Sequence, residues 1–324
     1  MTHTIFDCTV DDISLERLIA RFVAPRSPYY FNDSDIMKKL LETGIAVYTR
    51  KEFAANFPTF SLDYGSLYNL WNMDFPELSV VVLLSKQQFL HLDARIRAHL
   101  LEHQVQCGRG HIYLRDWFSE FVESPKGLFT FEGREYYSLT SEDWWDFNDS
   151  SRKQWFLKWM KEWRKEQATG VLDFPNDHKT VPYPFIREYA GTFADTSGPN
   201  CFAAAIGTAV AAANPDHQSN GNVLIHQWMH PEPFFRLLQA IGYDKTLEVR
   251  NYNEFRHLLP ADVLVWESKE GVAIHAAFAV SNDLMFQKQG QGWESPWQVL
   301  RLNDIGYSHC LDNDGIISIH RKNG

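Results

Sequence analysis

The segment that most constrains this fold is the apolar run from Cys201 to Ala213, CFAAAIGTAVAAA, which contains no charged residue. Its thirteen residues are too few to cross a bilayer as a helix, which takes about 20. A run of this length is typical of a helix buried inside a folded domain. Gly198-Pro199 interrupts the preceding chain, Asn200 can cap a helix, and Asn214-Pro215 ends one. The sequence therefore predicts a buried helix that begins at Asn200–Cys201.

The composition is that of a globular protein. The 324 residues are 44% hydrophobic and 22% charged, enough for one large domain or two ordinary ones. The net charge of −10 argues against sequence-independent binding to nucleic acid, which needs a basic surface. We therefore expect no nucleic-acid partner.

The cellular setting is predicted from the N-terminus and the cysteines. The opening residues lack the basic and apolar regions of a secretory signal, and no stretch suits a membrane span. The four cysteines, Cys8, Cys107, Cys201 and Cys310, show no pairing rhythm. These features favour a reducing, cytoplasmic setting with no disulfide framework and no membrane partner.

The first half of the chain is predicted to be a mixed α/β domain of unknown role. Apolar spacing and capping residues predict these elements: helices over Asp11–Phe22, Ser34–Leu41, Gln87–Gln104 and Ser151–Ala168, and a buried strand over Leu78–Leu84. Trp155, Trp159 and Trp163 recur every four residues in the last helix, which indicates core packing more often than a ligand-stacking face.

A change in composition predicts where this domain ends. Prolines and an Asn-Asp pair between Gly170 and Pro184 indicate an extended connector. We place the boundary there, giving domains over 1–172 and 173–324.

The second half predicts an α+β domain. After the Cys201 helix, a helix follows Pro231 and ends at Gly242, and a strand over Thr246–Arg250 and a short helix over Asn251–Leu259 are possible. Strand-like runs then follow at Asp262–Trp266, Val272–Val280, Leu284–Gln287, Gln298–Leu302 and Ile316–His320. Helices followed by an antiparallel meander form an α+β domain.

Cys201 is the candidate nucleophile. A helix N-terminus offers unpaired N–H groups and a positive dipole end, which stabilise a thiolate and can hold the oxyanion formed after its attack. The N–H of Cys201 is the first candidate for an oxyanion donor. The alternative is a small buried residue on an apolar helix.

His275 is the candidate base, and Gln287 the group that orients it. In a strand, His275 shares a face with Ala273, Ala277 and Ala279, while Ile274 and Phe278 point the other way. The small alanines leave room for the helix that carries the thiol, so we expect that helix on the His275 face. Gln287 comes just after the Asn282-Asp283 turn, where its strand can pair with that of His275. The alternatives are a hydrogen-bonded core histidine and a solvent-facing glutamine.

Six segments carry a family resemblance. They are Tyr189-Ala190-Gly191-Thr192, Ser197-Gly198-Pro199-Asn200-Cys201, Ala261-Asp262-Val263-Leu264-Val265-Trp266, Ile274-His275-Ala276-Ala277-Phe278-Ala279-Val280 with Met285-Phe286-Gln287, and Val299-Leu300-Arg301-Leu302. Their order and spacing resemble the NlpC-type bacterial cell-wall cysteine peptidases over roughly residues 185–305. Asn200, Phe202-Ala203 and Gln287 stand where that family has aspartate, Ser-Gly and histidine.

The resemblance implies a papain-like fold with a Cys201–His275–Gln287 triad, and places Tyr189 and Asn200 at the substrate or oxyanion site. The expected reaction is cleavage of an amide or isopeptide bond in a small peptide-like substrate, possibly derived from cell wall, through an acyl-enzyme and without a cofactor. Two alternatives are an acyltransferase that uses the same cysteine and an inactive binding module of the same fold.

Metal sites are weaker alternatives. His226 and His230 have the spacing of a zinc-protease helix, but Gln227 replaces the catalytic glutamate and Pro231 follows. The set His103, Cys107 and His111 is interrupted by glycines, and Asp312-Asn313-Asp314-Gly315 reads as a turn rather than a calcium loop. We expect no metal.

Overall fold

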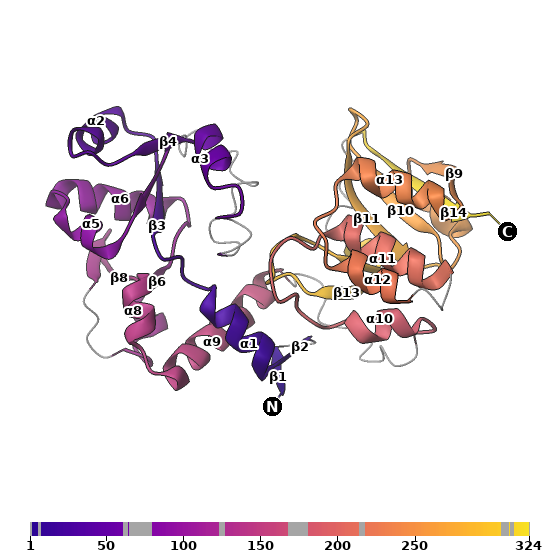
Figure 1. Ribbon diagram of the computed structural model, residues 1–324, viewed down its shortest axis with the longest axis horizontal. Coiled ribbons are helices and arrows are strands. Elements are labelled where there is room, and N and C mark those ends of the chain that lie inside the picture. Colours follow the sequence, from indigo (N-terminus) through magenta and orange to yellow (C-terminus); the bar gives the residue numbers. More distant parts are fainter. Residues whose placement is uncertain are drawn as a thin grey trace. The chain divides into compact units, whose positions relative to one another are not determined.

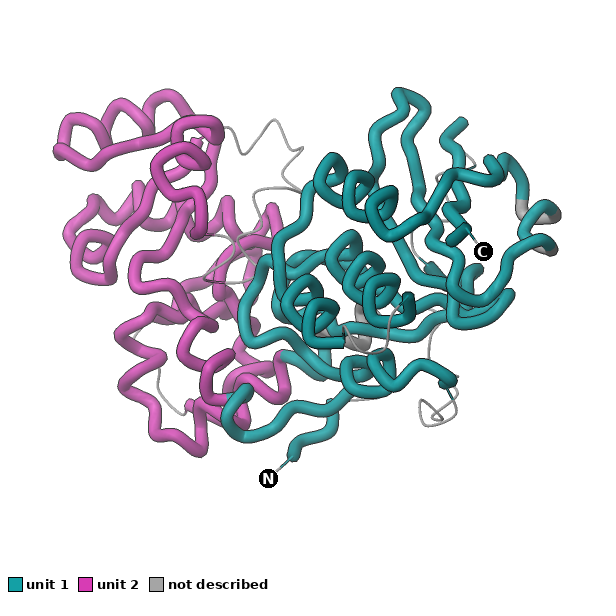
Figure 2. The backbone as a smooth tube through the Cα atoms, turned by 45° about the vertical axis from the view of Figure 1, so that its right-hand side comes forward, with its two compact units in different colours: residues 1–15, 160–324 teal, residues 16–159 magenta. Residues whose placement is uncertain are grey.

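The computed structural model describes residues 2–5, 8–60, 64, 80–122, 127–167, 181–213, 218–305, 311 and 314–323 (Figure 1), with the backbone alone at 163–167, 252, 253 and 256. The chain forms two compact units (Figure 2). Glu16–Trp159 form the N-terminal unit, and Met1–Leu15 with Met160–Gly324 form the C-terminal unit. The boundary predicted near residue 172 lies outside the described residues.

The first residues belong to the C-terminal unit because their hairpin pairs with it. β1 (Thr2–Ile5) and β2 (Cys8–Asp11) are antiparallel, and the N–H of Thr9 donates to the carbonyl of Gly191 at 2.7 Å. This backbone bond joins two segments that are far apart in the sequence.

The N-terminal unit combines short helices with two small sheets. Its helices are the end of α1 (Asp12–Ala20), α2 (Ser34–Glu42), α3 (Arg50–Asn56), α5 (Lys86–His91), α6 (Ala94–Gln106), α7 (Arg115–Phe118), α8 (Ser141–Asp146) and most of α9 (Asp149–Gln167). Its strands are β3 (Ser27–Phe31), β4 (Val47–Thr49), β5 (Val80–Leu84), β6 (Ile112–Leu114), β7 (Leu128–Phe131) and β8 (Arg134–Ser138). They pair in the orders β3-β5-β4 and β6-β8-β7, all antiparallel.

Two predictions about this unit have clear outcomes. The single helix expected over Gln87–Gln104 is wrong, because the chain breaks after His91 and Asp93 caps a second helix by accepting the N–H of Arg95 at 2.8 Å. Core packing of the tryptophans is confirmed for Trp155 and Trp159, which are both buried. The side chain of Trp163 lies outside the described residues.

The C-terminal unit is α+β, as predicted. Its helices are α10 (Pro184–Tyr189), α11 (Cys201–Ala213), α12 (Gln218–Ile225) and α13 (Pro231–Ala240), with the 3₁₀ turns η6 (Tyr252–His257) and η7 (Leu302–Asp304). Its main strands are β9 (Tyr243–Val249), β10 (Val263–Glu267), β11 (Ala273–Ala279), β12 (Leu284–Lys288), β13 (Trp297–Arg301) and β14 (Ile316–Lys322). They form one antiparallel sheet in the order β13-β12-β11-β10-β14-β9.

Each face of this sheet carries its own apolar core. We call the first the helix face, because α11 packs on it and α12 and α13 lie on the same side (Figure 1). The helix face includes Val263, Val265, Ala276, Phe278, Phe286, Trp297 and Val299, which cluster with Cys201. The second, the far face, includes Leu264, Trp266, Ala277, Ala279, Met285 and Leu300. Side chains alternate between the two faces along each strand, as a pleated strand requires.

The buried helix α11 is held by a close approach to α12. A Cβ added to Gly221 would lie 2.6 Å from the carbonyl oxygen of Gly207 and 3.0 Å from the Cβ of Ala211. Only glycine allows the two backbones to meet at this distance. Across the described ranges, no helix is long and apolar enough to cross a membrane.

Candidate active site

Cys201 is the first residue of α11, as the sequence predicted, and it lies at the edge of the helix-face core. Asn200 caps the helix through its side-chain oxygen, which accepts the N–H of Ala203 at 3.1 Å. Its amide nitrogen donates to the carbonyl of Met229 at 2.7 Å and fixes the residue before the thiol. Asn200 therefore fixes the segment that carries Cys201 through both ends of its amide.

The thiol of Cys201 is buried but surrounded by donors. The side chain is 7% exposed, and burial raises its pKa to about 11. The backbone N–H groups of Ala276, Phe202 and Cys201 act on the sulfur in the opposite direction, as does the charge of Lys288. In this conformation the thiol is protonated at neutral pH, yet every polar neighbour that acts on it favours the thiolate.

The N–H of Ala276 reaches the sulfur where two strands separate. The ladder between β11 and β12 pairs Phe278 with Phe286 and Ala279 with Met285, and it does not continue to Ala276 and Lys288. The α11 terminus thus meets the sheet where a strand N–H is available to the thiol.

Lys288 is a buried charged residue close to the thiol. Its side chain is fully buried, and its ammonium nitrogen Nζ donates to the carbonyls of Gly290 and Gly292 at 2.7 and 2.6 Å. Burial lowers its pKa to about 7, and the nearby Glu294 and Cys201 partly oppose this decrease. Lys288 lies two residues after Phe286, so both point to the helix face.

The loop that follows, residues 289–296, is bonded to the segment before Cys201. The N–H of Gly198 donates to the carbonyl of Gln291 at 2.8 Å, and the N–H of Trp293 donates to the hydroxyl of Ser197 at 3.0 Å. Trp293 and Glu294 are buried in it. This loop and the segment before Cys201 therefore form one hydrogen-bonded unit.

His275 lies on the far face of the sheet. Its ring is fully buried and contacts that of Trp266, with centroids 5.1 Å apart, and Trp266 belongs to the far-face core. Its neighbour Ala276 points the other way, toward Cys201. The expectation that the cysteine helix covers the His275 face is wrong. The helix packs on the face that carries the larger Phe278. The small alanines of the His275 face pack instead against bulky side chains of the far-face core.

Gln287 accompanies His275, away from the thiol. Met285, two residues earlier on β12, belongs to the far-face core, so Gln287 points to that face as well. Burial lowers the pKa of His275 to about 3, and a hydrogen bond with Gln287 opposes that decrease. The structure thus brings His275 and Gln287 together, as predicted, but does not bring them to Cys201.

Tyr189 lies in the same core cluster as Cys201, and its hydroxyl is 3.4 Å from Nε2 of His226. Both rings also contact Trp297, with centroids 5.3 Å and 5.4 Å away. Burial raises the pKa of Tyr189 to about 12 and lowers that of His226. Tyr189 is therefore part of an aromatic cluster of the helix face that includes His226.

The metal alternatives find no support in the geometry. α12 ends at Ile225 and α13 begins at Pro231, so His226 and His230 do not share a helix. The Cys107 sulfur is 3.3 Å from Nδ1 of His103. Within the part of the chain that the structure describes, no three His, Cys, Asp or Glu side chains could hold a metal ion. The Asp312-Asn313 turn lies outside the described residues.

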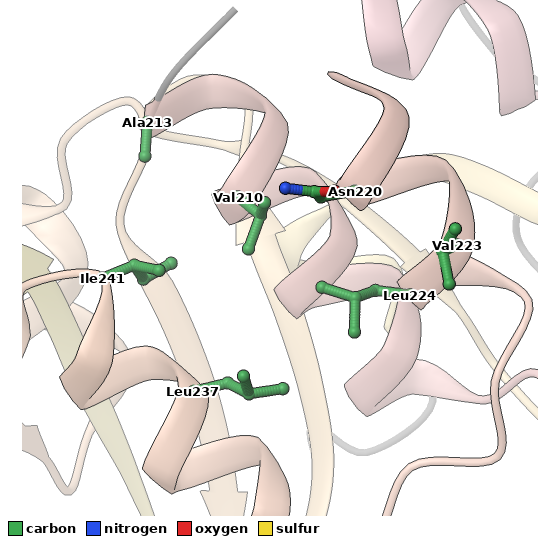
Figure 3. Close-up of a pocket in the computed structure, with 7 residues that line it drawn as sticks. All are labelled: Val210, Ala213, Asn220, Val223, Leu224, Leu237 and Ile241. Atoms are coloured by element: carbon green, nitrogen blue, oxygen red, sulfur yellow. The ribbon is translucent and has the colours of Figure 1, made fainter. Parts of the chain in front are cut away.

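A pocket of about 460 Å³ opens between the other ends of the helices (Figure 3). It is lined by Val210, Ala213, Asn220, Val223, Leu224, Leu237 and Ile241. Val210 is nine residues along α11 from Cys201, about 14 Å at the rise of an α-helix. This apolar pocket is therefore separate from the thiol.

Lys288 is the site residue that we did not predict from the sequence. The signal that could have identified it is the alternation along β12, where Phe286 is a large apolar residue of the helix face and Lys288 follows in phase. Comparison with known proteins adds no candidate: no family model, no curated protein and no solved structure matches this chain.

Proposed function

We propose that the C-terminal unit is a cysteine hydrolase that cleaves an amide or isopeptide bond in a small peptide-like substrate through an acyl-enzyme on Cys201. The observation that carries the proposal is the convergence of three backbone N–H groups on a thiol at a helix N-terminus. Such donors stabilise a thiolate and, after attack, the oxyanion that forms beside it.

Access to the thiol requires displacement of its cover. Burial alone raises the pKa of Cys201, whereas the N–H groups of Ala276 and Phe202 and the charge of Lys288 lower it. A substrate that relieves this burial leaves the backbone N–H groups of Ala276 and Phe202 in place. The thiol then ionises more readily than it does when it is buried.

The papain-like, NlpC-type arrangement is part of the proposal. It is supported by the order of a helix-start cysteine followed by an antiparallel sheet that the helix covers. The chain departs from the family arrangement at one strand, β11, where Ala276 rather than His275 faces the thiol. Thiol chemistry of this kind needs no cofactor.

A non-catalytic binding module is the second candidate, and one observation favours it. A thiol that is 7% exposed, with a pKa raised to about 11, has the properties of an inert structural cysteine. On this alternative Cys201 is a small core residue and the thiol stays buried.

The test is acylation by p-nitrophenyl acetate, followed as nitrophenolate release between pH 6 and pH 9. The hydrolase gives a burst of about one nitrophenolate per chain and then slow turnover, which are the signs of an acyl-enzyme. Cys201→Ala should abolish both phases, while Cys8→Ala, at another buried cysteine of the same unit, serves as the matched control. A folded wild-type protein that shows no burst across this range overturns the hydrolase in favour of the binding module.

A further inference from the structure

We propose that Lys288, rather than a histidine, is the proton acceptor of Cys201 in the reaction proposed above. This inference rests on the proposed function and assigns its general base. It begins from the faces of the sheet: His275 and Gln287 lie on the far face, whereas Lys288 lies on the helix face with the thiol.

The hydrogen bonds of Lys288 suit a neutral amine. A neutral amine has two N–H bonds and one lone pair, and the carbonyls of Gly290 and Gly292 accept two hydrogens from Nζ. These two bonds hold the nitrogen in place and leave its lone pair to accept a proton. An ammonium would use the same position for a third N–H and would instead stabilise the thiolate.

The surroundings of Lys288 allow both forms near neutral pH. Complete burial disfavours the ammonium, and the neighbouring Glu294 and Cys201 favour it, which together bring its pKa to about 7. A base works best when its pKa is close to the working pH, and burial tunes lysines to this range. Glu294 is held near the loop backbone, since a Cβ at Gly292 would overlap its carboxylate.

The proton steps balance around this one amine. Lys288 takes the proton of the Cys201 thiol, the sulfur attacks the amide carbon, and the carbonyl electrons move to the oxygen. When the carbon–nitrogen bond breaks, the leaving amine takes the proton back from Lys288. Water then attacks the thioester and gives a proton to Lys288. The carbon–sulfur bond breaks, the acid is released, and the thiolate recovers the proton.

The experiment separates the charge of Lys288 from its ability to accept a proton. Lys288→Arg keeps a positive charge but cannot act as a base, and Lys288→Met removes both. With p-nitrophenyl acetate, the burst reports formation of the thiolate and the slow phase reports activation of water. Lys288→Arg and Lys288→Met should both slow the burst and the turnover about 100-fold, because neither side chain can accept the thiol proton. A Lys288→Arg burst within about threefold of wild type would show that only the positive charge of Lys288 acts on the thiol.

Matched controls and a second measurement keep the test decisive. Lys269→Met changes an exposed lysine of the β10–β11 turn and should leave both phases unchanged. Gln287→Met changes the residue that precedes Lys288 on β12, whose buried side chain points to the far face of the sheet. Wild-type turnover should rise with pH through an apparent pKa near 7, and a flat profile between pH 6 and pH 8 overturns the inference even if both Lys288 variants fail to fold.

The outcomes also separate this inference from the function on which it rests. If Cys201→Ala still turns over the ester, the proposed function fails. If Cys201→Ala is inactive while Lys288→Arg turns over at the wild-type rate, the function stands and Lys288 is not its base.

Discussion

Both faces of the six-stranded sheet bury polar side chains, and the pair Cys201 and Lys288 on the helix face differs from the pair His275 and Gln287 on the far face in what the surroundings favour. On the helix face, Cys201 meets three N–H groups and the charge of Lys288. On the far face, His275 meets the amide of Gln287 and the ring of Trp266. Burial keeps the thiol and the imidazole neutral at pH 7, but three backbone donors and the charge of Lys288 favour the thiolate, whereas the amide of Gln287 alone favours the imidazolium.

This difference shows that burial alone does not identify an active site. A buried group becomes reactive when its ionised form is already provided with partners, so that removing the cover is enough to ionise it. The imidazole of His275 has only the amide of Gln287 to favour its charged form, and the pair fits a structural role within the far-face core. The comparison makes four predictions.

The largest expected effect separates the two faces by activity. Cys201→Ala should abolish the nitrophenolate burst, whereas His275→Gln, a neutral replacement on the far face, should keep it within about twofold. Stopped-flow absorbance measures the burst, and circular dichroism checks the fold. If a folded His275→Gln protein loses the burst, the imidazole does reach the thiol and the comparison of faces is broken.

The second prediction concerns the helix packing that creates the helix face. Gly221→Ala places a methyl group 2.6 Å from the Gly207 carbonyl and should lower the free energy of unfolding by about 3 kcal/mol. Urea denaturation measures this loss. Val223→Ala, at an exposed position of the same helix, should change it by less than about 0.5 kcal/mol, and equal effects would show that α11 and α12 are not closely packed.

The third prediction uses acid to test the far face. Burial lowers the pKa of folded His275 from 6.5 to about 3, so the unfolded chain binds a proton that the folded chain does not. The stability from the neutral ring is fully present above pH 6.5 and is lost as the pH falls toward 3. Between pH 6.5 and pH 4.5, wild type should lose about 2 kcal/mol more than His275→Gln.

Urea midpoints at the two pH values measure this difference. His320, whose pKa burial lowers to about 4, is present in both proteins, so its contribution cancels in the subtraction. Parallel loss in the two proteins would mean that the imidazole is accessible to protons, as an active-site histidine would be.

The smallest expected effect sharpens the comparison on β12. Gln287→Met should leave turnover within about twofold, because its side chain lies on the far face. The sequence analysis assigned Gln287 as the orienter of a catalytic histidine, a role whose loss costs about 10- to 100-fold. A decrease in turnover of that size in a folded variant would show that Gln287 acts in the active site.

The sequence by itself determined the local features of this site. The helix start at Cys201 was predicted by Gly198-Pro199 and the capping Asn200, and the strands of the C-terminal sheet by their apolar runs. The partnership of His275 with Gln287 was also predictable, because both positions follow from the alternation of a strand and the length of a hairpin. These signals depend on neighbours within a few residues, so they can be recognised without the fold.

Only the tertiary structure decided which face of the sheet receives the helix. The alternation of side chains along a strand shows that Ala276 and His275 point in opposite directions. This alternation does not depend on which face of the sheet the helix covers. The choice was made by packing, because α11 covers the face that carries Phe278 and Phe286, while Trp266 and Met285 fill the face beside the small alanines. That choice depends on side-chain volumes from distant segments, and it brings Lys288 rather than His275 to the face of the thiol.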